Sequence, residues 1–444
     1  LPDVHRERAP RHTARPSVID MTIDMTGFRI RKLSVLALAA ATLAAGAALA
    51  PASASTTGGQ PAAAESANRW GKPDVDVRFA TFNASLNRGA EGELLADLST
   101  PDNEQAQVIA EIIQRNDPDV LLVNEFDYVE GGAAAELFRD NYLAVGQNGA
   151  EPVDYPYYFV APSNTGIPSD HDLNNDGVVG GPDDAFGFGL FPGQYGMVVY
   201  SKYPIDTAKV RTFQNFRWTD MPHNLLPTEF YSPEEREILR LSSKSHWDVP
   251  IRIDRKKTVH FLVSHPTPPT FDGPEDRNGR RNHDEIRFWA DYVDSKRTSY
   301  YIYDDDGRRG GLVPGSDFVI AGDQNADPLD GDSYEGAINQ LLEHRAVNAK
   351  TPPASEGAVE ASALQGGINL EHLGDPRFDT ADFAEPPGNI RVDYVLPSKS
   401  LRILDSAVFW PVSSDPLSWL TGTYPFPSSD HRLVWVDVRL PHMR

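Results

Sequence analysis

Short apolar runs recur along residues 75–440, and they constrain the fold of this chain more than any other feature. Each run has the length and apolar character of a β-strand, and the runs are bounded by polar or turn-forming residues. They predict strands at residues 75–83, 119–125, 197–201, 259–265, 317–323, 391–398, 401–410 and 431–440. Because the runs are nearly continuous in apolar residues, we expect the strands to be covered on both faces.

Helical periodicity lies between the apolar runs. Two sets of apolar side chains recur at helical spacing and would each form one face of a helix: Ala106, Ile109, Ala110 and Ile113, and then Ile286, Trp289, Ala290 and Val293. No internal repeat is present, and no linker is long enough to separate two domains. The pattern therefore predicts one large α/β domain over residues 73–444, with long loops.

Composition excludes several classes of protein. The 444 residues are 40% hydrophobic and 24% charged, which is a globular balance and argues against a disordered, collagen-like or coiled-coil chain. The sequence contains no cysteine, which excludes disulfide frameworks, thiolate zinc sites, cysteine nucleophiles and a lipid-modified cysteine anchor.

The first part of the chain has the features of a leader. In residues 29–54 a basic start precedes an apolar run and the small residues Ala52, Ser53 and Ala54, which is typical of a secretory signal peptide cleaved after Ala54. A membrane helix is the alternative, but the Ala-rich composition of the segment and its cleavage site favour a signal peptide. We expect a leader over residues 1–54, with Met21 or Met25 as the more natural start, and a flexible linker over 55–72.

Export would leave a strongly acidic protein. Removing residues 1–54 removes seven Lys and Arg residues and four Asp and Glu residues, so the formal net charge changes from −23 to −26. Proteins that coat nucleic acid hold the phosphate backbone with basic surfaces, so this charge disfavours, without excluding, a nucleic acid partner. No other stretch is long and apolar enough to span a membrane, and no basic amphipathic helix is evident. We expect a secreted monomer.

Polar residues capable of metal or phosphate chemistry follow several of the predicted strands. A polar residue that closes a strand is usually a turn former, so no single one is informative. Together they are harder to explain in that way: Asn83, Glu125, His265, Asp323, Asn325, Asp393, Asp430 and His431. Mg²⁺ prefers hard oxygen ligands, and phosphoryl transfer needs charge neutralisation, a positioned water and an acid for the leaving group.

The order of these motifs resembles that of the endonuclease/exonuclease/phosphatase superfamily, the deoxyribonuclease I-like fold. The matching segments are T-F-N at 81–83, N-E at 124–125, S-H at 264–265, G-D-Q-N at 322–325, V-D-Y at 392–394 and S-D-H at 429–431, with YGMVVYSKYPI at 195–205. The resemblance implies an α/β (α+β) four-layer sandwich, in which two packed mixed β-sheets are flanked by helices. The site would lie at the edge where the two sheets meet.

The resemblance also implies roles for individual residues. Glu125 would be the principal ligand of a Mg²⁺ or Mn²⁺ ion, with help from Asn83 and Asp430. The other five residues would act on the substrate: Asp323 would orient or deprotonate the attacking water, Asn325 and His431 would hold phosphate oxygens, Asp393 would fix the His431 ring, and His265 would protonate the leaving oxygen.

A basic cluster follows the His265 segment. The sequence DRNGRRNHDEIR at 276–287 contains Arg277, Arg280, Arg281 and Arg287 within a strongly acidic protein. One interpretation is a phosphate clamp, because the planar guanidinium group matches phosphate geometry. The other is a solvated helix start whose arginines pair with neighbouring acids.

The segment DLNNDGVVGGPD at 172–183 has the spacing of a calcium loop. The predicted ligands are Asp172, Asn174, Asp176, the carbonyl of Val178, and Asp183, with Gly177 at the sharp turn. The flanking residues do not form the helices of an EF-hand, so the prediction covers the loop alone. An Asx-rich turn without metal is the alternative.

These features favour one function over three others. We expect a secreted divalent-metal-dependent phosphoesterase that hydrolyses a small phosphate mono- or diester by in-line attack of water, with a structural Ca²⁺ as a further ion. The same residues could serve an extracellular nuclease or a phospholipid headgroup hydrolase. A non-catalytic secreted binding protein is the alternative of another class, and the complete set of acids and histidines argues against it.

Overall fold

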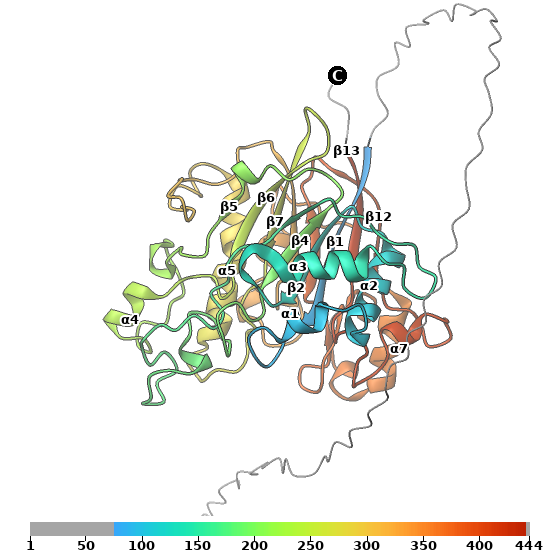
Figure 1. Cartoon of the computed structure of the whole chain (residues 1–444). Coiled ribbons are helices and arrows are strands. Elements are labelled where there is room, and N and C mark those ends of the chain that lie inside the picture. The colour runs from blue at the N-terminus through green and yellow to red at the C-terminus, as the bar shows by residue number, and fades with distance from the viewer. Residues whose placement is uncertain (1–74, 441–444) are drawn as a thin grey trace, which may run out of the picture. The chain divides into compact units, whose positions relative to one another are not determined.

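The structure is a computed structural model, and it describes residues 75–440. The predicted leader (1–54), its signal peptide (29–54) and the linker (55–72) lie outside the described residues. The described residues belong to one compact unit, which Figure 1 shows with its helices and strands labelled.

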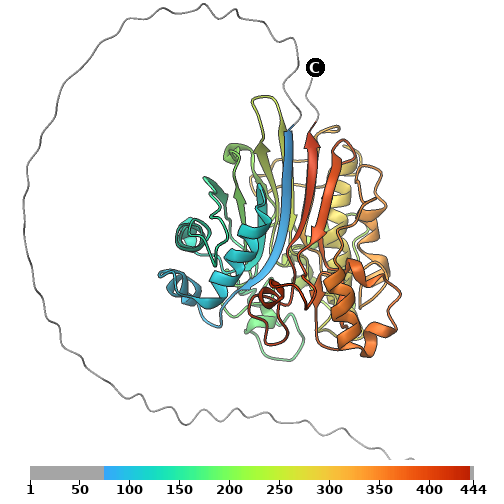
Figure 2. The ribbon, with the colours of Figure 1, turned by 90° about the vertical axis from the view of Figure 1, so that its right-hand side faces the viewer.

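The first sheet contains six strands in the order β12-β13-β1-β2-β4-β3. Their bounds are β1 Val75–Leu86, β2 Val120–Phe126, β3 Tyr157–Phe159, β4 Met197–Ser201, β12 Arg402–Val408 and β13 Val434–Leu440. Strands β1 and β2 are parallel and the other pairs are antiparallel, so the sheet is mixed. The long β1 lies at its centre, beside β13, although the two strands come from opposite ends of the domain (Figure 2).

The second sheet contains five strands in the order β11-β8-β7-β6-β5. Their bounds are β5 Arg211–Thr212, β6 His246–Arg252, β7 Thr258–Ser264, β8 Asp317–Asp323 and β11 Asp393–Pro397. Strands β7 and β8 are parallel and their neighbours are antiparallel. A separate two-stranded pair, β9 Ala381–Asp382 and β10 Asn389–Ile390, precedes β11.

Side-chain alternation along the strands produces the layers. Val77 and Phe79 of β1 pack between the two sheets with Phe261 and Val319 of the second sheet. Ala80 and Phe82 belong instead to the cluster formed with the helices on the outer face of the first sheet. Because successive strand residues point to opposite faces, one strand contributes to both cores.

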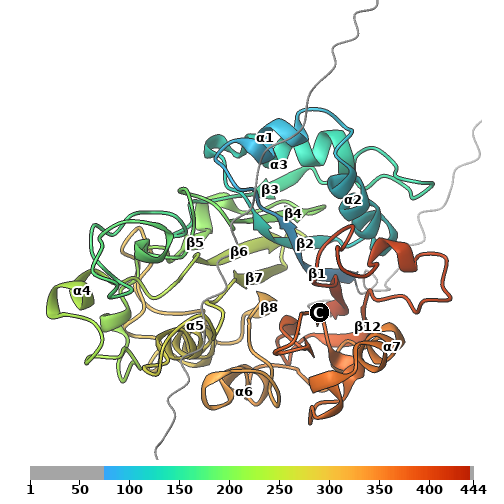
Figure 3. The ribbon, with the colours of Figure 1, turned by 90° about the horizontal axis from the view of Figure 1, so that it is seen from below.

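Helices cover the outer face of each sheet. The first sheet carries α1 Glu93–Leu98, α2 Glu104–Asn116 and α3 Ala133–Phe138, and the second carries α5 Arg277–Asp294 and α6 Asn339–Leu342. The remaining α-helices of the described residues are α4 Pro233–Ile238 and α7 Glu356–Gln365. Figure 3 looks along the strands and shows helices, sheet, sheet and helices in succession. The predicted four-layer sandwich is confirmed.

The sequence did not reveal strand β6. It contains Asp248 and Pro250, and a proline within an apolar run argues against a central strand because it cannot donate a ladder hydrogen bond. The structure resolves this conflict, since the two-residue β5 pairs only with Trp247 and Asp248 and leaves Pro250 beyond its end. Among the described helices, none combines the length and apolar character needed to cross a membrane.

Candidate active site

The polar residues singled out in the sequence gather where the carboxyl ends of strands from both sheets meet. Asn83 near the end of β1 donates from its amide nitrogen to Oδ2 of Asp323 at the end of β8, over 3.1 Å. The neighbouring Asn124 of β2 accepts from the backbone N–H of Asp323 at 3.4 Å. These contacts join the two sheets, and all three side chains are buried. Residues far apart in the chain thus share one edge of the sandwich.

Asp323 lies at the centre of the site. Its Oδ2 is 3.3 Å from Nε2 of His265 and 3.7 Å from Nε2 of His431, and its Oδ1 accepts from the backbone N–H of Asn325 at 2.8 Å. Burial alone would raise the pKa of Asp323, but the imidazoles of His431 and His265 hold it well below its usual range. Asp323 is therefore a buried carboxylate that stays ionised and faces two rings.

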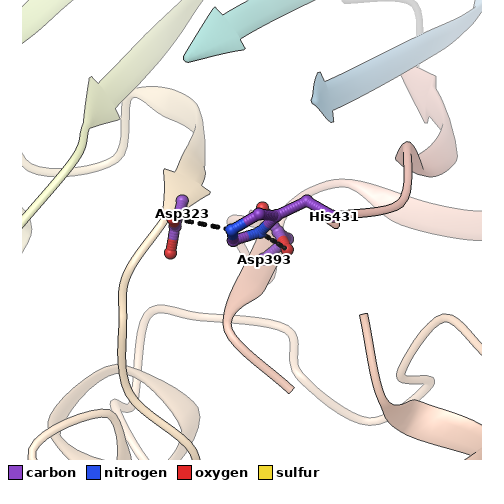
Figure 4. Close-up of side chains that lie close together, drawn as sticks. All are labelled: Asp323, Asp393 and His431. Carbon is purple, nitrogen blue, oxygen red and sulfur yellow. Dashed lines mark hydrogen bonds and ion pairs between the residues drawn. The ribbon is translucent and has the colours of Figure 1, made fainter. Parts of the chain in front are cut away.

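His431 is held by a second carboxylate. Its Nδ1 lies 2.9 Å from Oδ2 of Asp393, so the ring sits between Asp393 and Asp323 (Figure 4). Burial opposes a charge on this ring, but Asp393 and Asp323 raise the pKa of His431 well above its usual value. Thr380 fixes Asp393 in turn, because its hydroxyl donates to the same Oδ2 and accepts from the Asp393 backbone N–H, both at 2.9 Å. The result is an oriented, charged imidazolium.

Glu125 and Asp430 lie on either side of the end of β1. Oε2 of Glu125 accepts from the Asn87 amide at 2.9 Å, and Oδ1 of Asp430 lies 3.5 Å from the Ser85 hydroxyl. Both carboxylates are half-buried, and within residues 75–440 neither forms an ion pair with a basic side chain. The backbone of Glu125 adopts a positive φ of 56°, which costs energy for a residue with a side chain and is common at functional sites.

The donor set suits a hard divalent cation. Two carboxylates with free lone pairs, together with an amide oxygen such as that of Asn83, are the ligands that Mg²⁺ or Mn²⁺ prefers. Ligand atoms of Asp323, Asp393 and His431 also lie within 4.8 Å of one another. There, however, the 2.9 Å hydrogen bond between His431 and Asp393 already uses two of the three groups. Glu125 and Asp430 therefore fit the ion better.

The arginines of the predicted phosphate clamp are engaged with the protein. Arg277 forms an ion pair with Glu275, and Arg287 lies 3.2 Å from Asp291. The Arg281 guanidinium donates to the backbone carbonyls of residues 186, 240, 241 and 242. Arg280 donates to the Glu275 carbonyl and its guanidinium lies over the Tyr334 ring. The cluster thus ties the start of α5 to neighbouring loops.

The predicted calcium loop is closed by its own hydrogen bonds. Asp172 accepts from the backbone N–H groups of residues 176 and 177, Asn174 from that of 176, and Asp176 from that of 178. Val178 and Asp183 are exposed. The buried acid of the loop is Asp184, one residue beyond the predicted position, and it accepts from the N–H groups of residues 173, 174 and 180.

Three residues of the site gave no sequence signal. Thr380 donates a hydrogen bond to Asp393. Glu285 of α5 accepts from the backbone N–H groups of Ser243 and Thr267, at 2.6 Å each. Lys244, the residue after Ser243, is buried. Each comes from a loop or helix rather than from a strand end. The sequence offers one indication, for Lys244: it is a basic residue among small polar residues in a chain rich in acids.

The fold and the site define the class of protein. Two packed sheets bring a buried carboxylate, two imidazoles and two carboxylates without a basic partner to one edge, and this set of groups suits metal-assisted phosphoester chemistry. The sequence matches the model of the Endonuclease/Exonuclease/phosphatase family over residues 80–431, and the chain belongs to that family, whose members hydrolyse phosphoester bonds.

Solved structures with similar folds come from several bacteria. An endonuclease/exonuclease/phosphatase from Beutenbergia cavernae is 18% identical, with a TM-score of 0.45, covering 82% of this chain and 72% of that one. Sphingomyelinase C from Streptomyces griseocarneus is 14% identical (TM-score 0.41; 82% and 99% covered). A mannosyl-6-phosphatase from Bacteroides thetaiotaomicron is 11% identical (TM-score 0.38; 82% and 99% covered). Comparison with curated protein sequences gives no match.

Proposed function

We propose that this protein is a secreted, divalent-metal-dependent phosphoesterase that hydrolyses a small phosphate mono- or diester by in-line attack of water. One observation carries the proposal. Asp323 is an ionised, buried carboxylate 3.3 Å from His265 and 3.7 Å from His431, next to two half-buried carboxylates that have no basic partner among the described residues. This arrangement supplies a base, two imidazoles and a cation site without a covalent nucleophile.

Glu125 and Asp430, with Asn83, would hold the Mg²⁺ or Mn²⁺ ion. When bound, the ion neutralises charge on the phosphate oxygens. Glu125 contributes a carboxylate whose other oxygen is fixed by Asn87, so its free lone pairs keep their direction. Asp430 is fixed in the same way by hydroxyls of the neighbouring serines. Each carboxylate is thus oriented before the substrate arrives.

The remaining residues act on the substrate and on the water. Asp323 accepts a proton from the attacking water, because its low pKa keeps it ionised and its Oδ2 faces the site. The His431 imidazolium and the Asn325 amide hold phosphate oxygens, and Asp393 keeps the His431 ring in place. His265 donates a proton to the leaving oxygen. Its Nδ1 is buried without a hydrogen-bond partner within residues 75–440, so the ring is held mainly by packing and by Asp323.

Charge favours a small ester over duplex DNA. A duplex is bound through many phosphate contacts to Lys and Arg, and the arginines of α5 are engaged with Glu275, Asp291 and backbone carbonyls. The exported chain would carry a formal net charge of −26, which repels a polyanion. An extracellular nuclease and a phospholipid headgroup hydrolase remain the alternatives that use the same site.

Export and calcium binding belong to the proposal as well. The signal-peptide pattern at 29–54 supports secretion. The spacing of oxygen-bearing side chains in the loop at 172–183 supports a structural Ca²⁺. The hydrogen bonds that Asp172 and Asp176 accept from the loop backbone hold these acids at the turn.

The function is tested by offering the purified protein p-nitrophenyl phosphate, bis(p-nitrophenyl) phosphate, sphingomyelin vesicles and plasmid DNA, each with Mg²⁺ and with EDTA. We expect the highest kcat/KM on one of the two small esters and loss of that activity with EDTA. Faster cleavage of DNA or of the vesicles would replace the small-ester proposal, and activity that survives EDTA would refute the metal requirement.

A further inference from the structure

Lys244 is a buried lysine at the edge of the candidate active site. Its residue is only 7% exposed, and it lies two positions before β6. In the β6–β7 register His246 pairs with Ser264, so the segment before β6 runs alongside the segment after β7, which begins with His265. The hydroxyl of Ser243 also donates to the His265 carbonyl at 3.4 Å. The backbone therefore places Lys244 next to the catalytic histidine.

Glu285 fixes the backbone around Lys244. One carboxylate oxygen of Glu285 accepts from the N–H of Ser243 and the other from the N–H of Thr267, both at 2.6 Å. The Lys244 carbonyl accepts from the N–H of Asn164 at 2.8 Å. The position of the Lys244 backbone is thus determined on both sides.

The ammonium group lacks a partner of its own. Within residues 75–440, no hydrogen bond or ion pair reaches the Lys244 nitrogen. Burial lowers the pKa of this ammonium, and the carboxylates of Glu285, Glu125 and Asp323 oppose that effect from a distance. Burying an unpaired charge is costly. Such a group is retained where something else supplies its partner.

Three of the four arginines at the start of α5 cannot take this role without giving up side-chain contacts, and the fourth, Arg280, is held by the Glu275 carbonyl and the Tyr334 ring. Arg277 and Arg287 are paired with acids, and Arg281 is held by four carbonyls. Lys244, in contrast, has no hydrogen bond or ion pair at its ammonium within the described residues, and Glu125 and Asp323 of the site are among the carboxylates whose charges act on it. We propose that the Lys244 ammonium binds a non-bridging phosphate oxygen of the substrate and is the principal cationic side chain, besides His431, that neutralises it. This inference rests on the proposed phosphoesterase function.

The test compares Lys244→Met with Lys244→Arg. Methionine keeps the length of the side chain and removes its charge, while arginine keeps the charge. Lys209→Met is the matched control, because it removes the same charge from an exposed lysine paired with Asp206 and located beyond β4, at the opposite end of the sheet from Glu125. The measurements are binding of inorganic phosphate by calorimetry with Mg²⁺ present, kcat/KM on p-nitrophenyl phosphate and on its diester, and the melting temperature without phosphate.

We expect Lys244→Met to weaken phosphate binding roughly 10- to 100-fold, as for loss of one charge-assisted hydrogen bond. Its kcat/KM should fall by a similar factor, its melting temperature should stay equal or rise, and Lys244→Arg should retain part of the binding. Wild-type phosphate binding in Lys244→Met, equal weakening in Lys209→Met, or no phosphate binding by the unmutated protein would each overturn the inference. A lower melting temperature with normal phosphate binding would make Lys244 a structural counter-charge.

Failure of the inference differs from failure of the proposed function. If the unmutated protein hydrolyses an ester and Lys244→Met does so equally well, only the role of Lys244 is wrong. If the protein hydrolyses none of the esters but binds phosphate through Lys244, the function is wrong and the binding role stands. Should Lys244→Met fail to fold, Lys244→Gln carries the same comparison with a polar side chain.

Discussion

Asp379 is a buried acid next to Thr380, which supports the candidate active site, and replacing Asp379 should stabilise the protein. It is 7% exposed, and no hydrogen bond reaches its carboxylate within the described part of the chain. Burial, together with the charges of Asp327, Asp330 and Asp375, raises the pKa of Asp379 to about 8. The next residues support the site, since Thr380 bonds Asp393 and Ala381 pairs with His431.

The sign and size of the effect follow from proton linkage. An unfolded aspartate has a pKa of about 3.9, so between about pH 4 and pH 8 the unfolded chain is ionised while folded Asp379 keeps its proton. Folding then takes up a proton, and stability falls as pH rises through this window. At about 1.4 kcal/mol per pH unit, the loss approaches 4 kcal/mol at neutral pH, and partial solvation reduces it to roughly 2–4 kcal/mol.

Asp379→Asn removes this dependence because the amide has the same shape and never ionises. Urea unfolding of the two proteins should agree near pH 4 and diverge steadily towards pH 8, with the variant more stable by roughly 2–4 kcal/mol at pH 7. Asp405→Asn, at an exposed acid of β12, should leave the curve unchanged. A difference that is constant across pH, or a less stable Asp379→Asn, would refute the reasoning.

Three further changes probe the site and the loop. Glu125→Gln should fold normally and lose roughly 100- to 1,000-fold in kcat/KM at saturating Mg²⁺, because it replaces a charged carboxylate ligand of the ion by a neutral amide. The rate is measured on the best small ester. Asp393→Asn removes the nearest charge that raises the pKa of His431, so burial dominates and the alkaline limb of the kcat/KM–pH profile should move to lower pH. Calcium should raise the melting temperature of the unmutated protein, and Asp172→Ala combined with Asp176→Ala should abolish that rise.

Each of these changes has a matched control. Glu130→Gln removes an exposed acid near Glu125 and should keep full activity. Asp248→Asn breaks a His–Asp pair outside the site, with His260 at 2.7 Å, and should leave the pH profile in place. Asp183→Ala should keep the calcium effect if Asp184 closes the loop. Near-wild-type rates in Glu125→Gln, an unmoved alkaline limb in Asp393→Asn, or a calcium-independent melting curve would contradict the corresponding prediction.

Strand order along the chain was readable from the sequence because apolar patterning is local. Runs such as 119–125 and 317–323 correspond to β2 and β8 within one residue at each end. The differences have local reasons. Strand β6 was not predicted because Asp248 and Pro250 interrupt its apolar run, and the predicted strand 431–440 begins only at Val434 because His431 lies in the site. The resemblance in motif order supplied the four-layer arrangement, which periodicity alone could not.

The chemistry-bearing residue types were likewise visible in the sequence, but their partners were not. Asp323, Asp393 and His431 could be singled out because each stands beside an apolar strand. Lys244, Glu285 and Thr380 could not, since a loop residue carries no periodic signal and its role depends on what packs against it. Sequence also left the arginines of 277–287 open between a clamp and a paired helix start, and only the fold shows their partners.

The sequence by itself determined which segments become strands, and which acids and histidines follow them, because both depend on neighbours within a few residues. Tertiary structure alone decided that Asp323 stays ionised between two imidazoles while Asp379 keeps a proton to about pH 8. The two carboxyl groups are chemically identical in the chain. They differ because packing surrounds one with imidazoles and the other with carboxylates, and electrostatic energy depends on distances that only the fold sets.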